Sequence, residues 1–400
     1  MTNSLSRAAF SALLASLLGT GACGGTHDSG TNPGNGAGSG GSGGDPGGSG
    51  GGDANGAGGG AGVPKVDPAA VPCDLHTTWD GDELCIEAPP ADQGFQVHVG
   101  PTNYDDPDEV AKYVIQAGDE TNGYYYLKSA NDSDVFFYKR NYRMRPGSHH
   151  LIVSEASADH PDGWNTPAAG GAPTSPIGGI DVGRRLGGTQ NDVKDNPIGG
   201  VLPPENVGIG MPLTAHAQLS VNLHHNNVTD HPILREAWVN FWYVPKEEVT
   251  QEAKEMFAVG GFLMSINPGE HTTLHYTCDV TEDGRILTAY GHRHAHNVRF
   301  DAWRTRNGAK ESIYEGFDWA EPMVLEYSSV VTNPPPDLAT RTEGGWSGIL
   351  DLEKGDVVEW ECEVNNDSAN TLHFTNETVN GEMCILVGDT VGPAINCVHP

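Results

Sequence analysis

Short apolar or alternating runs, separated by Gly, Pro, Asn and Asp, recur along the chain from residue 94 onward. They span residues 94–99, 124–127, 135–138, 150–153, 219–223, 237–244, 272–276, 286–290, 298–303, 323–327, 357–361 and 383–387. Runs of this length between turn residues predict short strands, and many short strands predict antiparallel β-sandwiches. We therefore predict an all-β fold of two tandem antiparallel β-sandwich domains with jelly-roll-like architecture.

Two segments depart from this pattern. Residues 247–257 show weak helical amphipathicity, so we predict a helix there, at the junction between the two domains. Residues 162–212 are rich in Gly and Pro, which predicts a long loop on the first domain. The predicted domains span residues 66–246 and 247–400.

The first 65 residues predict export and no packed core. Ala8 to Leu18 is an apolar run of about 11 residues, which fits a signal peptide and is too short to span a bilayer. Small residues precede Cys23, as at a bacterial lipoprotein cleavage site, although Thr20 stands where that motif prefers Leu. We predict a signal peptide over residues 1–23 and a lipid anchor on Cys23. Ordinary signal cleavage that leaves a spare cysteine is the alternative.

From residue 24 to residue 62, 20 of 39 residues are Gly, a composition that forms no core. We predict a disordered tether over residues 24–65. The predicted location is the cell envelope or the extracellular face, either in the periplasm or anchored to the outer membrane. No other stretch is apolar enough to span a bilayer, so membrane contact is expected only through the lipid anchor.

The chain is strongly acidic, with 53 Asp and Glu against 22 Lys and Arg and a formal net charge of −31. Nucleic-acid binding needs clustered Lys and Arg, so we expect no nucleic-acid partner. The chain has seven cysteines, and six remain if Cys23 carries lipid. An even number in an oxidising compartment predicts three disulfides, but six cysteines allow 15 pairings.

Three histidine clusters are candidates for metal binding. His149 and His150 are consecutive, and neighbours on a regular strand point to opposite faces. Both can bind one metal only at a strand end or a bulge, which Pro146 and Gly147 favour. His224 and His225 form a second pair. Two surface histidines are the alternative interpretation of each pair.

The third cluster is His292, His294 and His296, which alternate and so share one face of a strand. Two histidines at this spacing can chelate one cation, but periodicity does not say which two. Met383 would by default be a core residue. A thioether is a soft ligand, however, and soft ligands select Cu(I) over zinc, so a site of two histidines and Met383 would favour copper.

The order of these clusters resembles the ascorbate-dependent type II copper monooxygenases, the family of peptidylglycine α-hydroxylating monooxygenase and dopamine β-monooxygenase. In that family His-His and a later His bind one copper, and His-x-His and a later Met bind the other. The resemblance covers roughly residues 90–400 and includes the segments 202–209, 260–270, 303–308 and 381–384. The distance to Arg306-Asn307-Gly308 favours His292 with His294 and leaves His296 as a neighbour.

The resemblance implies one copper on each domain, the two sites facing a cleft between the domains. The implied ligands are His149, His150 and His224 for the first copper and His292, His294 and Met383 for the second. The second copper would be catalytic, and ascorbate the expected reductant. The resemblance also implies the disulfides Cys362–Cys384 and Cys278–Cys397, which leaves Cys73 with Cys85.

Departures from the family limit the substrate. An Arg two residues before His-x-His holds the substrate carboxylate in the peptide-amidating enzyme, and Tyr290 stands there in this chain. The Asn and Tyr that follow the ligand Met are replaced by Ile385 and Val387. We therefore expect a small or more apolar substrate, hydroxylated at a C–H bond with O₂.

Three other functions remain open. The same scaffold could be a non-catalytic copper-binding or electron-transfer protein, because a fold does not determine a function. A zinc hydrolase would use only the histidines, and Met383 argues against it because zinc sites are built from nitrogen, oxygen and thiolate ligands. The chain could also be a structural β-sandwich with incidental histidines.

Overall fold

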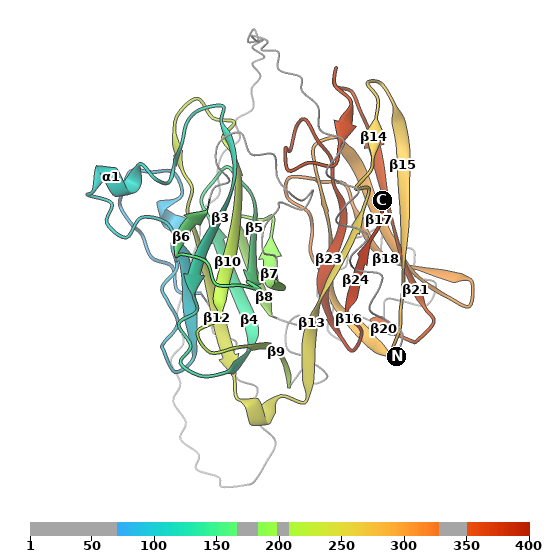
Figure 1. Cartoon of the computed structure of the whole chain (residues 1–400), viewed down its shortest axis with the longest axis horizontal. Coiled ribbons are helices and arrows are strands. Elements are labelled where there is room, and N and C mark those ends of the chain that lie inside the picture. The colour runs from blue at the N-terminus through green and yellow to red at the C-terminus, as the bar shows by residue number, and fades with distance from the viewer. Residues whose placement is uncertain (1–69, 166–182, 198–207, 328–349) are drawn as a thin grey trace, which may run out of the picture. The chain divides into compact units, whose positions relative to one another are not determined.

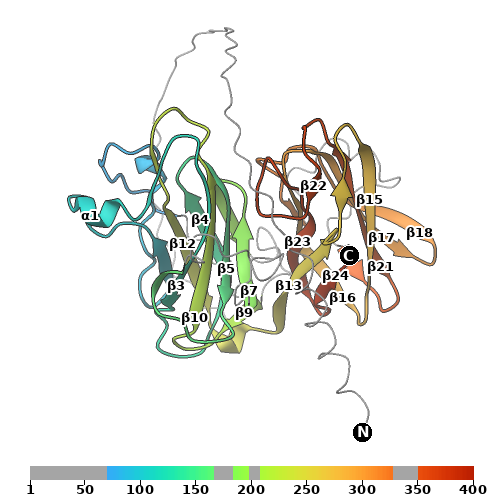
Figure 2. The same cartoon turned by 45° about the horizontal axis from the view of Figure 1, so that its top comes forward.

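The computed structural model describes residues 70–165, 183–197, 208–327 and 350–400 (Figures 1 and 2). These belong to a compact unit that begins at Asp67 and ends at Pro400. The predicted signal peptide, Cys23 and the predicted tether lie outside the described residues, as does much of the matched segment 202–209.

The fold is all-β, as predicted. The helices among the described residues are the four-residue α1 (Pro107–Val110) and the short 3-10 turns η2 (Asp82–Leu84) and η4 (Lys246–Glu248). None of them is long and apolar enough to cross a bilayer. The architecture therefore rests on strand pairing and on the packing of sheets.

One hydrophobic core lies between two groups of strands in the first part of the chain. An antiparallel sheet runs in the order β6 (Gly163–Asn165), β3 (Glu120–Lys128), β10 (Gln218–Asn226), β5 (Ser148–Glu155) and β7 (Arg184–Thr189). The other layer contains β1 (Gly94–Val99), β12 (Ala237–Val244), β4 (Val135–Met144), β9 (Ile209–Leu213) and β8 (Val193–Pro197). Alternate residues of both layers, such as Leu151 and Val221 facing Val97 and Val239, are fully or almost fully buried in the shared core.

A second core lies between two further groups of strands. One layer contains β13 (Gln251–Gly260), β23 (Cys384–Val391), β16 (Gly284–Arg293), β19 (Leu325–Glu326), β20 (Leu350–Leu352) and β24 (Ile395–Val398). The other is an antiparallel sheet of β15 (His271–Asp279), β21 (Val357–Asn365), β17 (Asn297–Arg306) and β18 (Ala309–Gly316). Two small sheets pair β2 (Val114–Ile115) with β11 (Ile233–Leu234) and β14 (Ser265–Ile266) with β22 (Leu372–His373).

The predicted helix at residues 247–257 is wrong. Residues 251–260 form β13, which pairs antiparallel with β23 and parallel with β24 and β9. The β9 contact is only two residue pairs long, Gln251 with Ile209 and Glu252 with Gly210, yet it joins the two layers into one 11-stranded sheet of the described residues. Pairing on both edges overrides the helix propensity of this segment. The boundary between two domains at 246/247 stays a prediction.

The predicted long loop at residues 162–212 is also wrong in its described parts. They contribute β6, β7, β8 and the first four residues of β9. β7 is Gly-rich and pairs along β5, with Gly187 at a φ of 140°. Glycine tolerates that conformation because it has no Cβ, so Gly content here marks an irregular strand as well as turns.

The three predicted disulfides are confirmed. Cys362 on β21 and Cys384 on β23 join the two layers of the second core, and Cys278 at the end of β15 joins Cys397 on β24. Cys73 pairs with Cys85 near the start of the described chain. Disulfides persist in oxidising compartments, which agrees with the predicted export.

We expect the Cys278–Cys397 disulfide to stabilise the fold more than Cys73–Cys85. The sequence separations are 119 and 12 residues, and chain-entropy loss in the unfolded state grows with loop length. Replacing both cysteines of each pair by Ala should lower the free energy of unfolding by about 2 kcal/mol more for the long loop. Urea unfolding of the two variants measures this, and an equal or reversed order would contradict it.

Candidate metal centre

His149 and His150 face the same site because β5 contains a bulge. In the pairing of β5 with β10, His150 lies opposite His224, whereas Ser148 lies opposite His225. His149 is the extra residue between these pairs. A bulge of this kind breaks the alternation of side chains, so two consecutive residues reach one site. The structure thus supplies the local geometry that the His-His pair requires.

His224 and His225 lie on opposite faces of β10. His224 is fully buried and its ring centroid lies 5.0 Å from those of both His149 and His150. His225 is also fully buried, so the alternative of a solvent-facing His225 is wrong. Both ring nitrogens of His225 lack a hydrogen-bond partner.

His292 and His294 come from the end of β16 and the residues just after it. In the pairing with β23, Tyr290 lies opposite Val387 and His292 opposite Ile385. Continuing this register sets His294 opposite Met383, which directly precedes β23. One carboxylate oxygen of the buried Glu382 accepts hydrogen bonds from the backbone N–H groups of His294 at 2.7 Å and Met383 at 2.8 Å. His294 and Met383 are therefore close neighbours.

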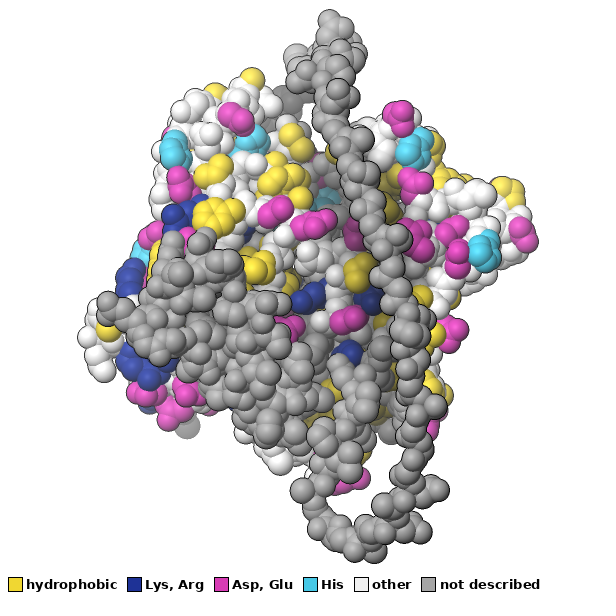
Figure 3. Space-filling model, turned by 180° about the vertical axis from the view of Figure 1, so that it is seen from behind, with side chains coloured by type: hydrophobic (Ala, Val, Ile, Leu, Met, Phe, Trp, Pro, Cys, Tyr) yellow, Lys and Arg dark blue, Asp and Glu magenta, His cyan; other side chains and the backbone are white. Residues whose placement is uncertain are grey.

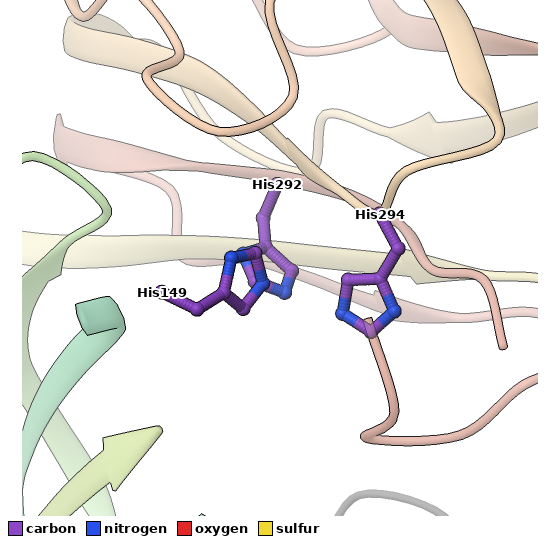
Figure 4. A group of neighbouring side chains, drawn as sticks. All are labelled: His149, His292 and His294. Atoms are coloured by element: carbon purple, nitrogen blue, oxygen red, sulfur yellow. The ribbon is translucent and has the colours of Figure 1, made fainter. Parts of the chain in front are cut away.

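The five histidines gather in one buried cluster rather than at two separate points. Ligand nitrogens of His149, His150 and His224 lie within 4.8 Å of one another, and so do those of His149, His292 and His294. Figure 4 shows the rings of the latter three close together. His149 therefore belongs to both groups. These distances describe a site where the two groups of histidines meet.

The cluster presents nitrogens that have no hydrogen-bond partner. His150 Nε2 lies 2.7 Å from Asn222 Oδ1, and His224 Nε2 lies 2.8 Å from Glu120 Oε1. These partners leave Nδ1 of both rings buried and unpartnered, as are His149 Nε2 and both nitrogens of His294. Buried polar atoms are rarely left unsatisfied, and a neutral imidazole held by a partner at its other nitrogen is a typical metal ligand.

Burial keeps four of the five imidazoles neutral. It lowers the pKa of His149, His150 and His292 well below the usual value, and that of His294 to about 3, with neighbouring imidazoles adding to the shift. A neutral imidazole binds a metal without first losing a proton. The donor set therefore fits a transition metal, and imidazole is a ligand that copper and zinc share.

His296 lies near the cluster in sequence but is bound elsewhere. Its Nδ1 lies 3.1 Å from Asp367 Oδ1 and its Nε2 lies 2.8 Å from the Val379 carbonyl oxygen. Both ring nitrogens thus have partners away from the five-histidine cluster. The geometry groups His292 with His294 and leaves His296 aside.

A cavity of about 600 Å³ opens beside the cluster. His150, His292 and Met383 are among its lining residues, together with Tyr290, Ile385 and Val387. About half of the lining residues are apolar or aromatic and the others are mostly polar or charged, a mixture found in pockets that bind small molecules. The three positions at which the resemblance predicted an altered substrate site therefore face this cavity.

Sequence reasoning missed two acidic residues of the site. Glu120 on β3 accepts from His224 and also from the backbone N–H and hydroxyl of Thr378, both at 2.9 Å. Glu382 is fully buried, and burial raises its pKa to about 8. In a chain with 53 acidic residues, neither had a distinguishing motif, although Glu382 directly precedes Met383.

No protein-family model matches the sequence, and no curated protein matches it. Solved structures that resemble the fold include the major capsid protein P2 from bacteriophage PM2, with 8% identity and a TM-score of 0.31, and the STIV MCP, with 8% identity and a TM-score of 0.27. Each comparison covers 75% of this chain and 98% of the other chain. Likeness at this level carries no argument about function.

We expect His149 to be the most sensitive metal ligand, because its ring belongs to both groups of three. His149→Ala should weaken the binding of Cu(II) to both groups, whereas His224→Ala or His294→Ala should affect one. Isothermal titration of metal-free protein measures the affinities and stoichiometry. His296→Ala is the matched control, since its ring nitrogens are bound elsewhere. Metal binding that is unchanged in His149→Ala would contradict this assignment.

The buried imidazoles also predict a pH dependence of the metal-free protein. The pKa of His294 is lower in the folded state than in the unfolded state, so the unfolded chain binds more protons below about pH 6.5. The stabilisation that neutral His294 contributes is fully present above that pH. On acidification below it, the free energy of unfolding falls by up to about 1.4 kcal/mol per pH unit. His294→Gln should flatten the slope of unfolding free energy between pH 6 and pH 4 by that amount. The exposed His216→Gln should not, and an equal slope in His294→Gln would refute the prediction.

Proposed function

We propose that this chain is a copper-dependent monooxygenase that hydroxylates a C–H bond of a small or apolar molecule. The observation that carries the proposal is the cluster of five buried histidines beside Met383 and a cavity of about 600 Å³. The cluster supplies ligands for a redox metal, and the cavity supplies space for an organic substrate next to them.

Copper fits the donor set better than zinc. Five imidazoles suit either metal, but the thioether of Met383 is a soft donor that favours Cu(I). Structural and catalytic zinc sites use thiolate, imidazole and carboxylate ligands, and a thioether is not among them. The carboxylates nearest the cluster, those of Glu120 and Glu382, already accept two or more hydrogen bonds each.

Five histidines and Met383 give six donors, enough for two sets of three, with the ring of His149 beside both sets, which supports a proposal of two copper ions per chain. His149, His150 and His224 would hold the first ion, and His292, His294 and Met383 the second. The sets come from either side of residue 247, which supports two tandem β-sandwich domains, residues 66–246 and 247–400. We propose that both sets face the cleft in which these domains meet.

Bound copper would supply the one-electron steps and the activation of O₂ that C–H hydroxylation requires. The overall change inserts one oxygen atom into a C–H bond and reduces the other to water, which consumes two electrons and two protons. A one-electron donor such as ascorbate would supply the electrons. These are the roles that the resemblance to the ascorbate-dependent family assigns.

The chain's own groups position the ligands and limit water. Asn222 and Glu120 engage Nε2 of His150 and His224 and so leave Nδ1 of each ring for the metal. Glu382 holds the backbone of His294 and Met383 together. Tyr290, Ile385 and Val387 line the cavity with apolar surface, which favours an apolar substrate over a peptide carboxylate.

The proposed setting is outside the cytosol. Three disulfides support an oxidising compartment, and the sequence before residue 66 supports an export signal, a lipid anchor on Cys23 and a tether. We propose the periplasm or the outer face of the cell envelope, where O₂ and small reductants are available.

We expect Met383→Ile to separate catalysis from folding. The two side chains have similar volume, so the swap should cost less than about 1.5 kcal/mol of stability. The second copper loses its soft ligand, so turnover should collapse while about one copper per chain remains bound. Copper analysis and O₂ uptake with ascorbate measure both effects. Met264→Ile is the control, because Met264 is buried in the same core but does not line the cavity.

His224→Ala should give the complementary result, because it removes a ligand of the first ion. Copper should then be lost from the first set, and O₂ uptake should stall for lack of electrons. The competing function, a non-catalytic copper-binding or electron-transfer protein, predicts two bound coppers with reversible reduction. Wild-type protein that binds two coppers but forms no hydroxylated product, across a broad panel of substrates, would support that alternative and overturn the proposed activity.

A further inference from the structure

The cavity beside the histidines contains a buried ion pair that the metal ligands do not use. Arg185 on β7 and Glu255 on β13 both line the cavity. Arg185 Nε lies 2.6 Å from Glu255 Oε1, and the guanidinium lies 4.3 Å from the centre of the Phe257 ring. Arg185 is 6% exposed, so this charge is almost fully removed from water.

The pair is close but incompletely hydrogen-bonded. Nε and Nη1 of Arg185 and Oε1 of Glu255 are buried, and none has a partner with hydrogen-bond geometry. The 2.6 Å contact is therefore an ion pair in which the Nε–H bond of Arg185 is not directed at Glu255 Oε1. Leaving a buried donor or acceptor unsatisfied is unfavourable, so this pair offers a donor and an acceptor to a ligand.

The charges around the pair balance. Burial raises the pKa of Glu255 to about 7, while Arg185 opposes that shift. Arg140 and Asp389, which also act on the charge of Glu255, pair with each other at 2.6 Å. A carboxylate ligand would gain one contact with Arg185 but would lie against the carboxylate of Glu255. An uncharged ligand group avoids this repulsion.

The pair lies on the way to the metal ligands. Tyr290 on β16 lines the same cavity as Arg185. Tyr290 and His292 are two residues apart on one face of β16, a separation of about 7 Å along a strand. A molecule bound at Arg185 would therefore extend along Tyr290 towards His292, over an apolar wall that includes Ile385 and Val387.

We propose that this cavity binds small molecules with an apolar body and one uncharged group that both accepts and donates hydrogen bonds, such as a primary amide. The amide oxygen accepts from Arg185 Nη1, and the amide N–H donates to Glu255 Oε1. The apolar body contacts Phe257, Ile385 and Val387. This assignment deepens the proposed function, on which it rests for the identification of the ligand as a substrate.

The test uses three matched probes on metal-free protein at pH 8. They are 3-phenylpropanamide, 3-phenylpropanoate and propylbenzene, which share an aromatic body and differ in the terminal group. Calorimetry or ligand-observed NMR gives each dissociation constant. We expect the amide to bind at least about tenfold more tightly than either of the others, because one net hydrogen bond to a charged group contributes about a factor of ten or more. The proposal would be overturned if 3-phenylpropanoate bound most tightly, if the three probes bound with equal affinity, or if none of them bound.

A double variant, Arg185→Met with Glu255→Gln, removes both charges together and so leaves no lone charge buried. It should bind the amide no better than propylbenzene. Arg184→Gln is the matched control: Arg184 also lines the cavity, but it is exposed and holds Glu155 at 2.5 Å, so the amide preference should survive. An amide preference that survives in the double variant would refute the role of the pair.

The binding test is independent of copper. Amide binding by a copper-loaded protein that forms no hydroxylated product across the broad substrate panel would overturn the proposed monooxygenase and leave the ligand site intact. Copper-dependent hydroxylation of apolar molecules without an amide preference would overturn the ligand site alone.

Discussion

A bulge in β5 brings His149 and His150 to one face of the strand, and the histidine cluster depends on it. The register shift against β10 leaves His149 without a pairing partner, so its ring reaches both His224 and His292. A regular strand would direct one of the two consecutive rings to the opposite face. The donor set would then lose the residue that belongs to both groups.

The second set of ligands needs no bulge, because its spacing already matches a strand. It needs the backbone to be held in place where β16 ends and β23 begins. Glu382 supplies this by accepting from two backbone amides, and the Cys362–Cys384 disulfide attaches the next residue to the opposite layer. Met383 thus sits between two constraints, which limits how far its sulfur can move. The proposed copper site would use donors that these partners hold in place.

Much of the fold follows from local pattern, and the failures have a physical cause. The hydrophobic pattern predicted β1 and β12 with the same first and last residues as in the structure, because one face of each strand packs in a core. It failed at β13, where Glu252, Lys254 and Glu255 suggest a helix and the strand is imposed by pairing with β23, β24 and β9. The histidines and Met383 were visible from spacing and family resemblance. Glu120, Arg185 and Glu255 were not, because their roles arise from contacts between residues far apart in the sequence.

The surface charge has a consequence for the supply of reagents. Acidic side chains are scattered over the described face in Figure 3, and the chain as a whole carries a formal net charge of −31. Such a field concentrates metal cations near the molecule and holds anions away. Loading with a divalent cation is then fastest in dilute buffer, whereas an anionic electron donor approaches more readily once salt has shortened the screening length to about 8 Å. Ionic strength therefore acts in opposite directions on the two reagents that the site would need.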